Sequence, residues 1–162
     1  MAQSTGLNKV RTAIFISGNG SNLKSIIKFS KLKKSPISVN LIISDNTKSK
    51  GLEYGKVFKI KKKIFNFKRK FIEKKIINEL KKNRINLICL AGFMRILSNF
   101  FIKSFKGKIL NIHPSLLPKF KGLNTHQRAI ENKEKYSGCT VHFVSSKLDS
   151  GKIILQKKVK IN

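Results

Sequence analysis

The sequence predicts an α/β fold with a central, mostly parallel twisted sheet flanked by helices. Short apolar runs of strand length alternate with helix-like segments over roughly the first hundred residues, which is typical of βαβ units. The first run, VRTAIFIS at residues 10–17, is almost continuously apolar, as expected of a strand buried on both faces. A chain of 162 residues has the length of one compact domain, so we expect a flexible lead over residues 1–9 and a single domain over residues 10–162.

A glycine-rich turn follows the first predicted strand. Residues 18–22, GNGSN, separate that strand from apolar residues at helical spacing. This arrangement presents backbone N–H groups to a phosphate, and Ser21 or Asn22 can cap the helix. The turn has neither the GK[ST] of a Walker A loop nor the third glycine of GxGxxG, where Leu23 stands. A tight turn without a ligand therefore explains it as well.

The middle of the chain continues the alternation. Residues 37–44 form a second expected strand, and residues 51–65 a short helix and a short strand. Residues 68–83 are expected to form an amphipathic helix. Its apolar stripe comprises Phe71, Ile72, Ile76, Ile77 and Leu80. Residues 85–91, INLICLA, form a third buried strand, and the apolar loop after it carries Arg95. That loop is either the wall of a pocket for a flat ring or ordinary core packing.

The most informative stretch lies after a short helix that Ser98 is expected to cap. There KILNIHPSLLPKFKG, residues 108–122, begins as a buried strand and continues as a proline-containing loop. Because proline cannot pair within a central strand, the strand must end near His113. Residues two apart on a strand share a face, so Asn111 and His113 project together at a strand end, where open α/β sheets bind ligands. A loop cap and a structural histidine are the alternative.

Further along, the sequence predicts a helix, two strands and a turn. The helix covers residues 125–132, the strands residues 139–145 and 153–161, and the turn, LDSG, residues 148–151. His142 lies within the first of these strands. A lone histidine in a strand is more often a structural group than a catalytic one.

Lysine dominates the charged residues. Lys and Arg number 36 against 7 Asp and Glu, which gives a formal net charge of +29. Such a field attracts nucleic acid, anionic membranes or small anions. The excess is spread along the chain, however, so drift of surface positions towards lysine is the favoured explanation over a specific polyanion partner. Basic and aromatic residues interleave too rarely to indicate an RNA-binding module.

The remaining composition favours a cytoplasmic protein. No signal-peptide pattern opens the sequence, and no apolar run reaches membrane-spanning length. Cys89 and Cys139 lie in apolar or strand-like stretches without metal-type spacing. This favours buried free thiols over a disulfide or a zinc site.

A set of motifs, in order and at characteristic separations, makes the sequence more specific. They are ISGNGSNLKSII, LAGFMRILS, NIHPSLLPKFKGLNTH, GCTVHFV and LDSG, with IILQ soon after. Together they resemble the phosphoribosylglycinamide formyltransferases, the folate-dependent enzymes of purine synthesis, over residues 10–161. The resemblance implies a Rossmann-like formyltransferase fold. It also implies transfer of the formyl group of the co-substrate 10-formyltetrahydrofolate to the amine of 5′-phosphoribosylglycinamide, with no metal and no covalent enzyme intermediate.

The resemblance also assigns roles to matching residues. The catalytic trio would be Asn111, His113 and Asp149. The phosphate of the ribonucleotide would be held by Gly20, Ser21 and Asn22. The folate would be bound by Arg69, Met94, Arg95, Ile96, Leu97, Asn111, Ser145, Ser146, Lys147, Leu148 and Asp149. The trio suits the reaction, because amine attack on a formamide creates an oxyanion that an amide and an imidazolium can stabilise. A nearby carboxylate favours the imidazolium.

The chain departs from this family pattern in places. Asn124 stands where the family usually has His, and Lys152 where it usually has Pro. Family members also continue past the last strand, with an acidic residue that contacts the nucleotide, so the C-terminal part is expected to be shortened.

Other functions remain as alternatives. Methionyl-tRNA formyltransferases and formyltetrahydrofolate hydrolases use the same Asn-His-Asp trio, but each carries an additional domain. A basic nucleic-acid binder on an inactive scaffold is a third alternative, and the intact trio argues against it. The expected partners are therefore small-molecule substrates, with no membrane, no specific nucleic acid, and a monomeric or homodimeric state.

Overall fold

The computed structural model describes residues 8–161, which divide into two compact units, one up to Met94 and one from Arg95. We describe each unit by itself. The predicted flexible lead falls mostly on residues 1–7, which lie outside the described residues. Lys9 is described, and its Nζ donates hydrogen bonds to two backbone carbonyl oxygens, at 3.3 and 3.0 Å. That residues 10–162 form one domain stays a prediction.

The N-terminal unit is built on a parallel sheet. Its strands are β1 (Val10–Ile16), β2 (Ile37–Ser44), β3 (Lys61–Ile64) and β4 (Leu87–Leu90), in the order β3-β2-β1-β4. The β1–β2, β1–β4 and β2–β3 pairs are all parallel. The apolar run of β1 is fully buried from Ala13 onward, as the sequence predicted for a strand covered on both faces.

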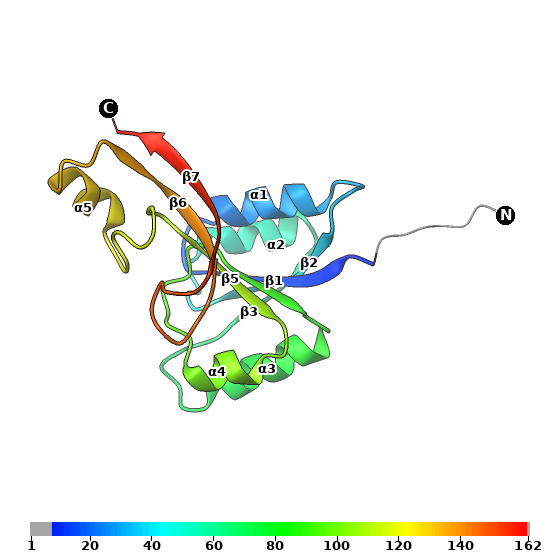
Figure 1. Cartoon of the computed structure of the whole chain (residues 1–162). Coiled ribbons are helices and arrows are strands. Elements are labelled where there is room, and N and C mark those ends of the chain that lie inside the picture. The colour runs from blue at the N-terminus through cyan, green and yellow to red at the C-terminus, as the bar shows by residue number, and fades with distance from the viewer. Residues whose placement is uncertain (1–7, 162) are drawn as a thin grey trace. The chain divides into compact units, whose positions relative to one another are not determined.

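Helices cover both faces of this parallel sheet. In Figure 1, α1 (Ser21–Ser30) and α2 (Glu53–Val57) lie together on one side, and α3 (Ile72–Lys82) lies on the other. A 3₁₀ turn, η1 (Lys50–Leu52), precedes α2. Leu23 and Ile27 of α1 are fully buried and belong to the cluster that packs against β1 and β2. The short helix and short strand expected over residues 51–65 are confirmed.

The predicted start of the amphipathic helix is wrong. Helix α3 begins at Ile72, and Phe71 is its N-cap, with a left-handed φ of 60° and an exposed fraction of 62%. The reason is a turn closed by Asn66, whose side-chain oxygen accepts the N–H of Lys68 at 2.9 Å and whose carbonyl accepts that of Arg69 at 3.1 Å. Phe71 therefore does not belong to the buried stripe, and Arg69 lies in the turn rather than on the helix. The other four stripe residues are buried.

The C-terminal unit is antiparallel. It contains α4 (Asn99–Ser104), β5 (Lys108–His113), α5 (Thr125–Glu131), β6 (Tyr136–Phe143) and β7 (Ile153–Lys160). Strand β6 pairs antiparallel with both β5 and β7. The predicted cap of α4 is confirmed, because Ser98 Oγ accepts the N–H of Phe101 at 3.1 Å. The strand that was expected to start at residue 139 starts three residues earlier, at Tyr136.

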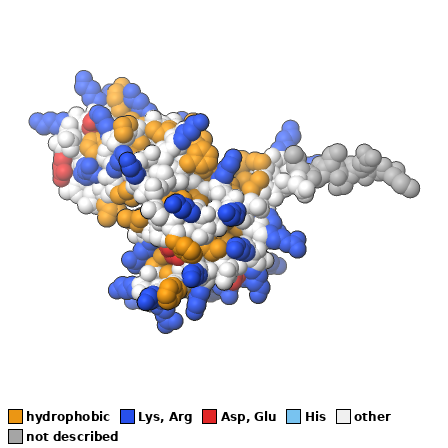
Figure 2. All heavy atoms as spheres, turned by 60° about the horizontal axis from the view of Figure 1, so that its bottom comes forward, with side chains coloured by type: hydrophobic (Ala, Val, Ile, Leu, Met, Phe, Trp, Pro, Cys, Tyr) orange, Lys and Arg blue, Asp and Glu red, His pale blue; other side chains and the backbone are white. Residues whose placement is uncertain are grey.

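The charged side chains on the surface agree with the basic composition. Lys and Arg side chains are scattered over the face seen in Figure 2, with few acidic side chains among them. Both Cys89 and Cys139 are free, but each is half-buried rather than buried as predicted. Partial burial raises the pKa of the Cys89 thiol to about 11. Within residues 8–161, no helix is long and apolar enough to cross a membrane.

Candidate active site

Asp149 is the centre of a buried hydrogen-bond network in the C-terminal unit. Its side chain is only 7% exposed. Oδ2 accepts the backbone N–H of Gly122 at 2.9 Å and lies 3.3 Å from Nδ1 of His113. Oδ1 accepts an N–H of Asn111 at 3.4 Å and lies 3.7 Å from Nε2 of His142. The structure thus brings the predicted trio into contact, although its members lie up to 38 positions apart in the chain.

Strand register and one tight turn produce this convergence. In the β5–β6 pair, Asn111 stands opposite His142, so the two side chains share a face with His113. Asp149 reaches them from the turn after β6, in a left-handed conformation with φ of 44° that aspartate tolerates better than most residues. A Cβ on Gly151 would overlap the carbonyl oxygen of Phe143, so the turn requires glycine there.

The contacts of His113 match a doubly protonated ring. Its Nε2 lies 2.9 Å from the carbonyl oxygen of Phe120, which can only accept, so Nε2 carries hydrogen and donates. Its Nδ1 faces the Asp149 carboxylate at 3.3 Å. A neutral ring with hydrogen on Nε2 would turn its Nδ1 lone pair towards that carboxylate. Only an imidazolium could donate to both acceptors at once, and the expected reaction chemistry would use such a charged donor.

The loop after His113 is docked onto β6 through one buried hydroxyl. Thr140 is fully buried, and its Oγ1 donates to the carbonyl oxygen of Ser115 at 2.6 Å. The same Oγ1 accepts the N–H of Leu117 at 3.1 Å and an N–H of Gln156 at 2.9 Å. These bonds hold the loop that carries the Phe120 carbonyl, and therefore help to fix the His113 ring.

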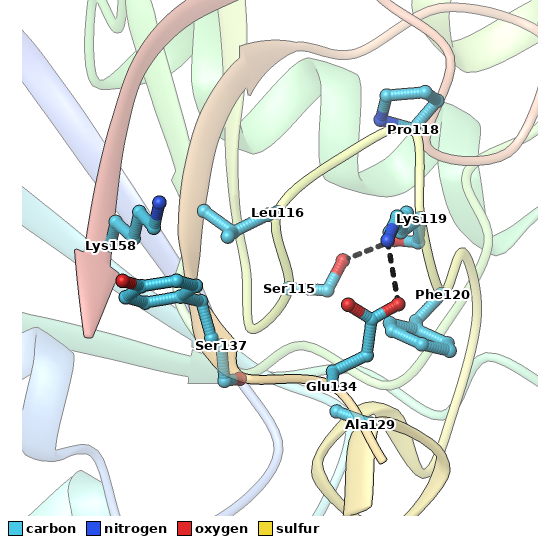
Figure 3. A pocket seen from close by; sticks show the side chains of 10 residues that line it. Ser115, Leu116, Pro118, Lys119, Phe120, Ala129, Glu134, Ser137 and Lys158 are labelled. Atoms are coloured by element: carbon cyan, nitrogen blue, oxygen red, sulfur yellow. Dashed lines mark hydrogen bonds and ion pairs between the residues drawn. The ribbon is translucent and has the colours of Figure 1, made fainter. Parts of the chain in front are cut away.

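A pocket of about 320 Å³ opens beside the same loop, between that loop, α5 and strands β6 and β7. Figure 3 shows Lys119 reaching Glu134 across it, and the two side chains form an ion pair of 2.6 Å. At the same pocket the ammonium of Lys158 lies 3.6 Å from the centre of the Tyr136 ring. The predicted trio does not line this pocket, and these charged groups already have partners in its wall.

The glycine turn of the N-terminal unit presents an uncapped helix. Gly20 is the N-cap of α1, in a left-handed conformation with φ of 75°, and no side chain caps the helix. The expectation that Ser21 or Asn22 caps α1 is therefore wrong, because both residues lie inside its first turn. The loop is held instead by its backbone, since Gly18 O accepts the Ser49 hydroxyl at 2.7 Å. The first-turn N–H groups of α1 have no acceptor within the helix, which suits an anion.

The residues expected to bind folate are distributed over both units. Arg69 and Met94 belong to the N-terminal unit, and both are exposed, Met94 by 61%. In the C-terminal unit, Ile96 is 76% exposed, whereas Leu97 is only 6% exposed and is part of the buried core. Residues 145–149 form the turn that carries Asp149, and Ser145 Oγ donates to the carbonyl oxygen of Lys147 at 3.1 Å.

Comparison with known proteins decides the family. The sequence profile described as formyl transferase matches residues 10–162. This chain belongs to the formyl transferase family. It is 43% identical over 155 residues to the phosphoribosylglycinamide formyltransferase of Haemophilus influenzae, which covers 93% of this chain and 73% of that protein.

Two further relatives bear on the fold and the length of this formyl transferase. A glycinamide ribonucleotide transformylase structure from Symbiobacterium toebii superposes with a TM-score of 0.91 at 35% identity, covering 98% of this chain and 80% of that one. The predicted Rossmann-like formyltransferase fold is thereby confirmed. The trifunctional purine biosynthetic protein adenosine-3 of Homo sapiens is 42% identical over 157 residues, which is 94% of this chain. The chain spans 16% of the length of that trifunctional protein.

Sequence reasoning missed several groups at this candidate site. The backbone N–H of Gly122 and the carbonyl of Phe120 complete the network, and a sequence does not mark backbone groups. His142 was interpreted as a structural residue, yet its Nε2 lies 3.2 Å from Nδ2 of Asn111. The signal that could have found it is the pairing of β5 with β6, which places the two residues opposite each other.

Proposed function

We propose that this chain transfers the formyl group of 10-formyltetrahydrofolate to the amine of 5′-phosphoribosylglycinamide, giving formylglycinamide ribonucleotide in de novo purine biosynthesis. The observation that carries the proposal is the Asp149 carboxylate, which meets both His113 and Asn111 in a buried site. Membership of the formyl transferase family and the names of the relatives support it. A cytoplasmic location stays a prediction.

The chemistry follows from the contacts of the trio. The substrate amine attacks the formyl carbon, a new C–N bond forms, and the carbonyl oxygen becomes an oxyanion. Asn111 supplies an amide N–H to that oxygen, and the His113 imidazolium supplies a charged donor. As the bond from the formyl carbon to the folate nitrogen breaks, His113 gives its proton to that nitrogen. The amine proton leaves through a water or Asp149, so the protons balance over one turnover.

His113 must release one contact to act in this way. Its Nε2–H is donated to the Phe120 carbonyl, at 2.9 Å. We propose that the substrate replaces this carbonyl as the acceptor. Phe120 has a left-handed φ of 54°, and residues 121–124 after it are mostly exposed, so the exchange requires no rearrangement of β5.

The two substrates are assigned to different sets of residues. Gly20, Ser21 and Asn22 are proposed to bind the phosphate through the first-turn N–H groups of α1, helped by the helix dipole. Met94 in the N-terminal unit and Ile96 in the C-terminal unit each expose an apolar side chain that suits contact with a flat pteridine ring. The other proposed folate contacts are Arg69, Arg95, Leu97, Asn111 and residues 145–149.

A glycine substitution tests the phosphate assignment. In Gly20→Ala, the new Cβ would lie 2.7 Å from the Gly51 Cα, at a left-handed φ of 75°. We expect the displaced turn to raise KM for the ribonucleotide about tenfold or more, because the N–H groups no longer converge on the phosphate. The matched control is Gly18→Ala, since nothing lies within 4 Å of a Cβ there. Equal KM values for the two variants would remove the turn from the phosphate site.

The activity is tested directly with both substrates. Purified protein is mixed with 10-formyltetrahydrofolate and glycinamide ribonucleotide, and release of tetrahydrofolate is followed together with the formylated nucleotide. Release that depends on the ribonucleotide supports the proposal. Release at the same rate without an acceptor identifies a hydrolase instead, and no release under either condition refutes formyl transfer. Salt-sensitive RNA binding by an inactive protein would favour the nucleic-acid alternative.

A further inference from the structure

His142 is buried against the Asn111 amide. Its side chain is 2% exposed, and the two residues stand opposite each other in the β5–β6 pair. Its Nδ1 lies 2.8 Å from the carbonyl oxygen of Phe143, which can only accept, so Nδ1 carries the hydrogen. In the neutral ring, Nε2 then has a lone pair, and it accepts one N–H of Asn111 at 3.2 Å.

The contact with His142 favours the Asn111 orientation in which the amide nitrogen, and not the amide oxygen, faces His142 and Asp149. Asn111 Nδ2 also donates to Asp149 Oδ1 at 3.4 Å, whereas among residues 8–161 no hydrogen-bond donor is found for Asn111 Oδ1. With the amide reversed, its oxygen would face the carboxylate oxygen and the lone pair of His142 Nε2. Both contacts would then be repulsive, so His142 and Asp149 together select one of the two amide orientations.

We propose that His142 is a positioning residue for formyl transfer, a role that rests on the function proposed above. Its Nε2 accepts one Asn111 N–H and so holds the amide nitrogen towards the reacting centre. The second N–H makes only the long 3.4 Å bond to Asp149, and it is donated to the formyl oxygen as that oxygen becomes an oxyanion. Without His142, the amide can rotate and present its own oxygen, which would repel the oxyanion.

The charged groups around His142 come from two other segments. Asp149 approaches from the turn before β7, and His113, on β5, pairs with the opposite oxygen of that carboxylate. Neither replaces the Nε2 acceptor, because Asp149 already accepts from the same amide nitrogen and His113 faces Phe120 and Asp149 with its two ring nitrogens. Asp149 contributes only the longer bond of 3.4 Å, so the shorter contact that fixes the Asn111 amide depends on the side chain at position 142.

Two substitutions at position 142 distinguish the hydrogen-bond acceptor role of the His142 side chain from its contribution to packing. His142→Leu fills the site but removes the acceptor, and we expect kcat to fall about tenfold to a hundredfold with KM nearly unchanged, since one oxyanion donor is misdirected. In His142→Gln, the amide oxygen can accept near the former Nε2, and we expect it to recover most of that loss. The matched control is His126→Leu, the same replacement at an exposed position of α5, with kcat unchanged.

A spectroscopic measurement tests the contact without relying on turnover. Nitrogen-15 NMR of the imidazole rings, assigned with the same variants, is expected to show His142 protonated on Nδ1 and unprotonated on Nε2. A wild-type protein that does not transfer formyl groups would refute the proposed function, while the NMR result would still decide the hydrogen bond. A His142 ring protonated on Nε2 at neutral pH overturns the inference, as does a folded leucine variant with wild-type kcat. If the leucine variant does not fold, the glutamine variant and the NMR result decide.

Discussion

Asp149→Asn is expected to lower kcat for formyl transfer by about 10³-fold or more while the fold persists. The carboxylate faces Nδ1 of His113 at 3.3 Å, and no other acid contacts that ring among the described residues. Asparagine keeps an oxygen for the Gly122 N–H but loses the negative charge that favours the imidazolium. The reaction then lacks both a charged donor for the oxyanion and a ready proton for the departing folate nitrogen.

The pH dependence of kcat distinguishes this loss from simple destabilisation. Because the carboxylate 3.3 Å from His113 Nδ1 is removed, Asp149→Asn is expected to change or abolish the pH profile of kcat. Glu131→Gln is a suitable control, because it removes one negative charge from an exposed position of α5 in the same unit. An Asp149→Asn variant with the wild-type rate and pH profile would exclude Asp149 from the mechanism.

Burial explains which elements could be predicted from the sequence. Most of β1 and the second half of β2 are buried in the parallel sheet, and their short continuous apolar runs mark them clearly. The end of β5 was predictable because Pro114 cannot extend a ladder. Strand β6 began earlier than expected because Tyr136–Gly138 pair with β7, whose residues are all exposed. In that region backbone pairing forms the strand without an apolar pattern to reveal it.

Some residues of the candidate site could be predicted from local sequence patterns, whereas others depend on contacts between distant parts of the chain. The period of two along β5 was enough to place Asn111 and His113 on one face. The contact of Asp149 with them is not encoded locally, and only the resemblance to a family suggested it. His142 was missed because its partner is set by the register between strands, which one strand's own sequence does not contain. The start of α3 was mispredicted for a local reason instead, because the Asn66 turn overrode a helical pattern.

His113→Ala is expected to have the other large effect, lowering kcat by about 10³-fold. Within the predicted trio, only this ring can both carry positive charge and release a proton, whereas Asn111 is a neutral donor. The ring is also buried, with 6% of the side chain exposed, so its removal leaves Asp149 Oδ2 with Gly122 as its remaining partner. That loss should destabilise the fold by about 1–3 kcal/mol, a cost that leaves an average domain folded.

Added imidazole separates the chemical role of this ring from its structural one. The alanine variant leaves a cavity beside Asp149, and a free imidazolium that enters it can donate one N–H to the Asp149 carboxylate and the other in place of the side chain. We therefore expect imidazole to restore part of kcat in His113→Ala but not in Asp149→Asn, which keeps its ring. Thermal unfolding of both variants, with the exposed His126→Ala as the control, measures the stability cost separately. Wild-type turnover by His113→Ala would refute the assignment of His113 as the proton donor. The other imidazole near Asp149 belongs to His142, and its Nε2 already accepts an N–H from Asn111, so it does not replace His113.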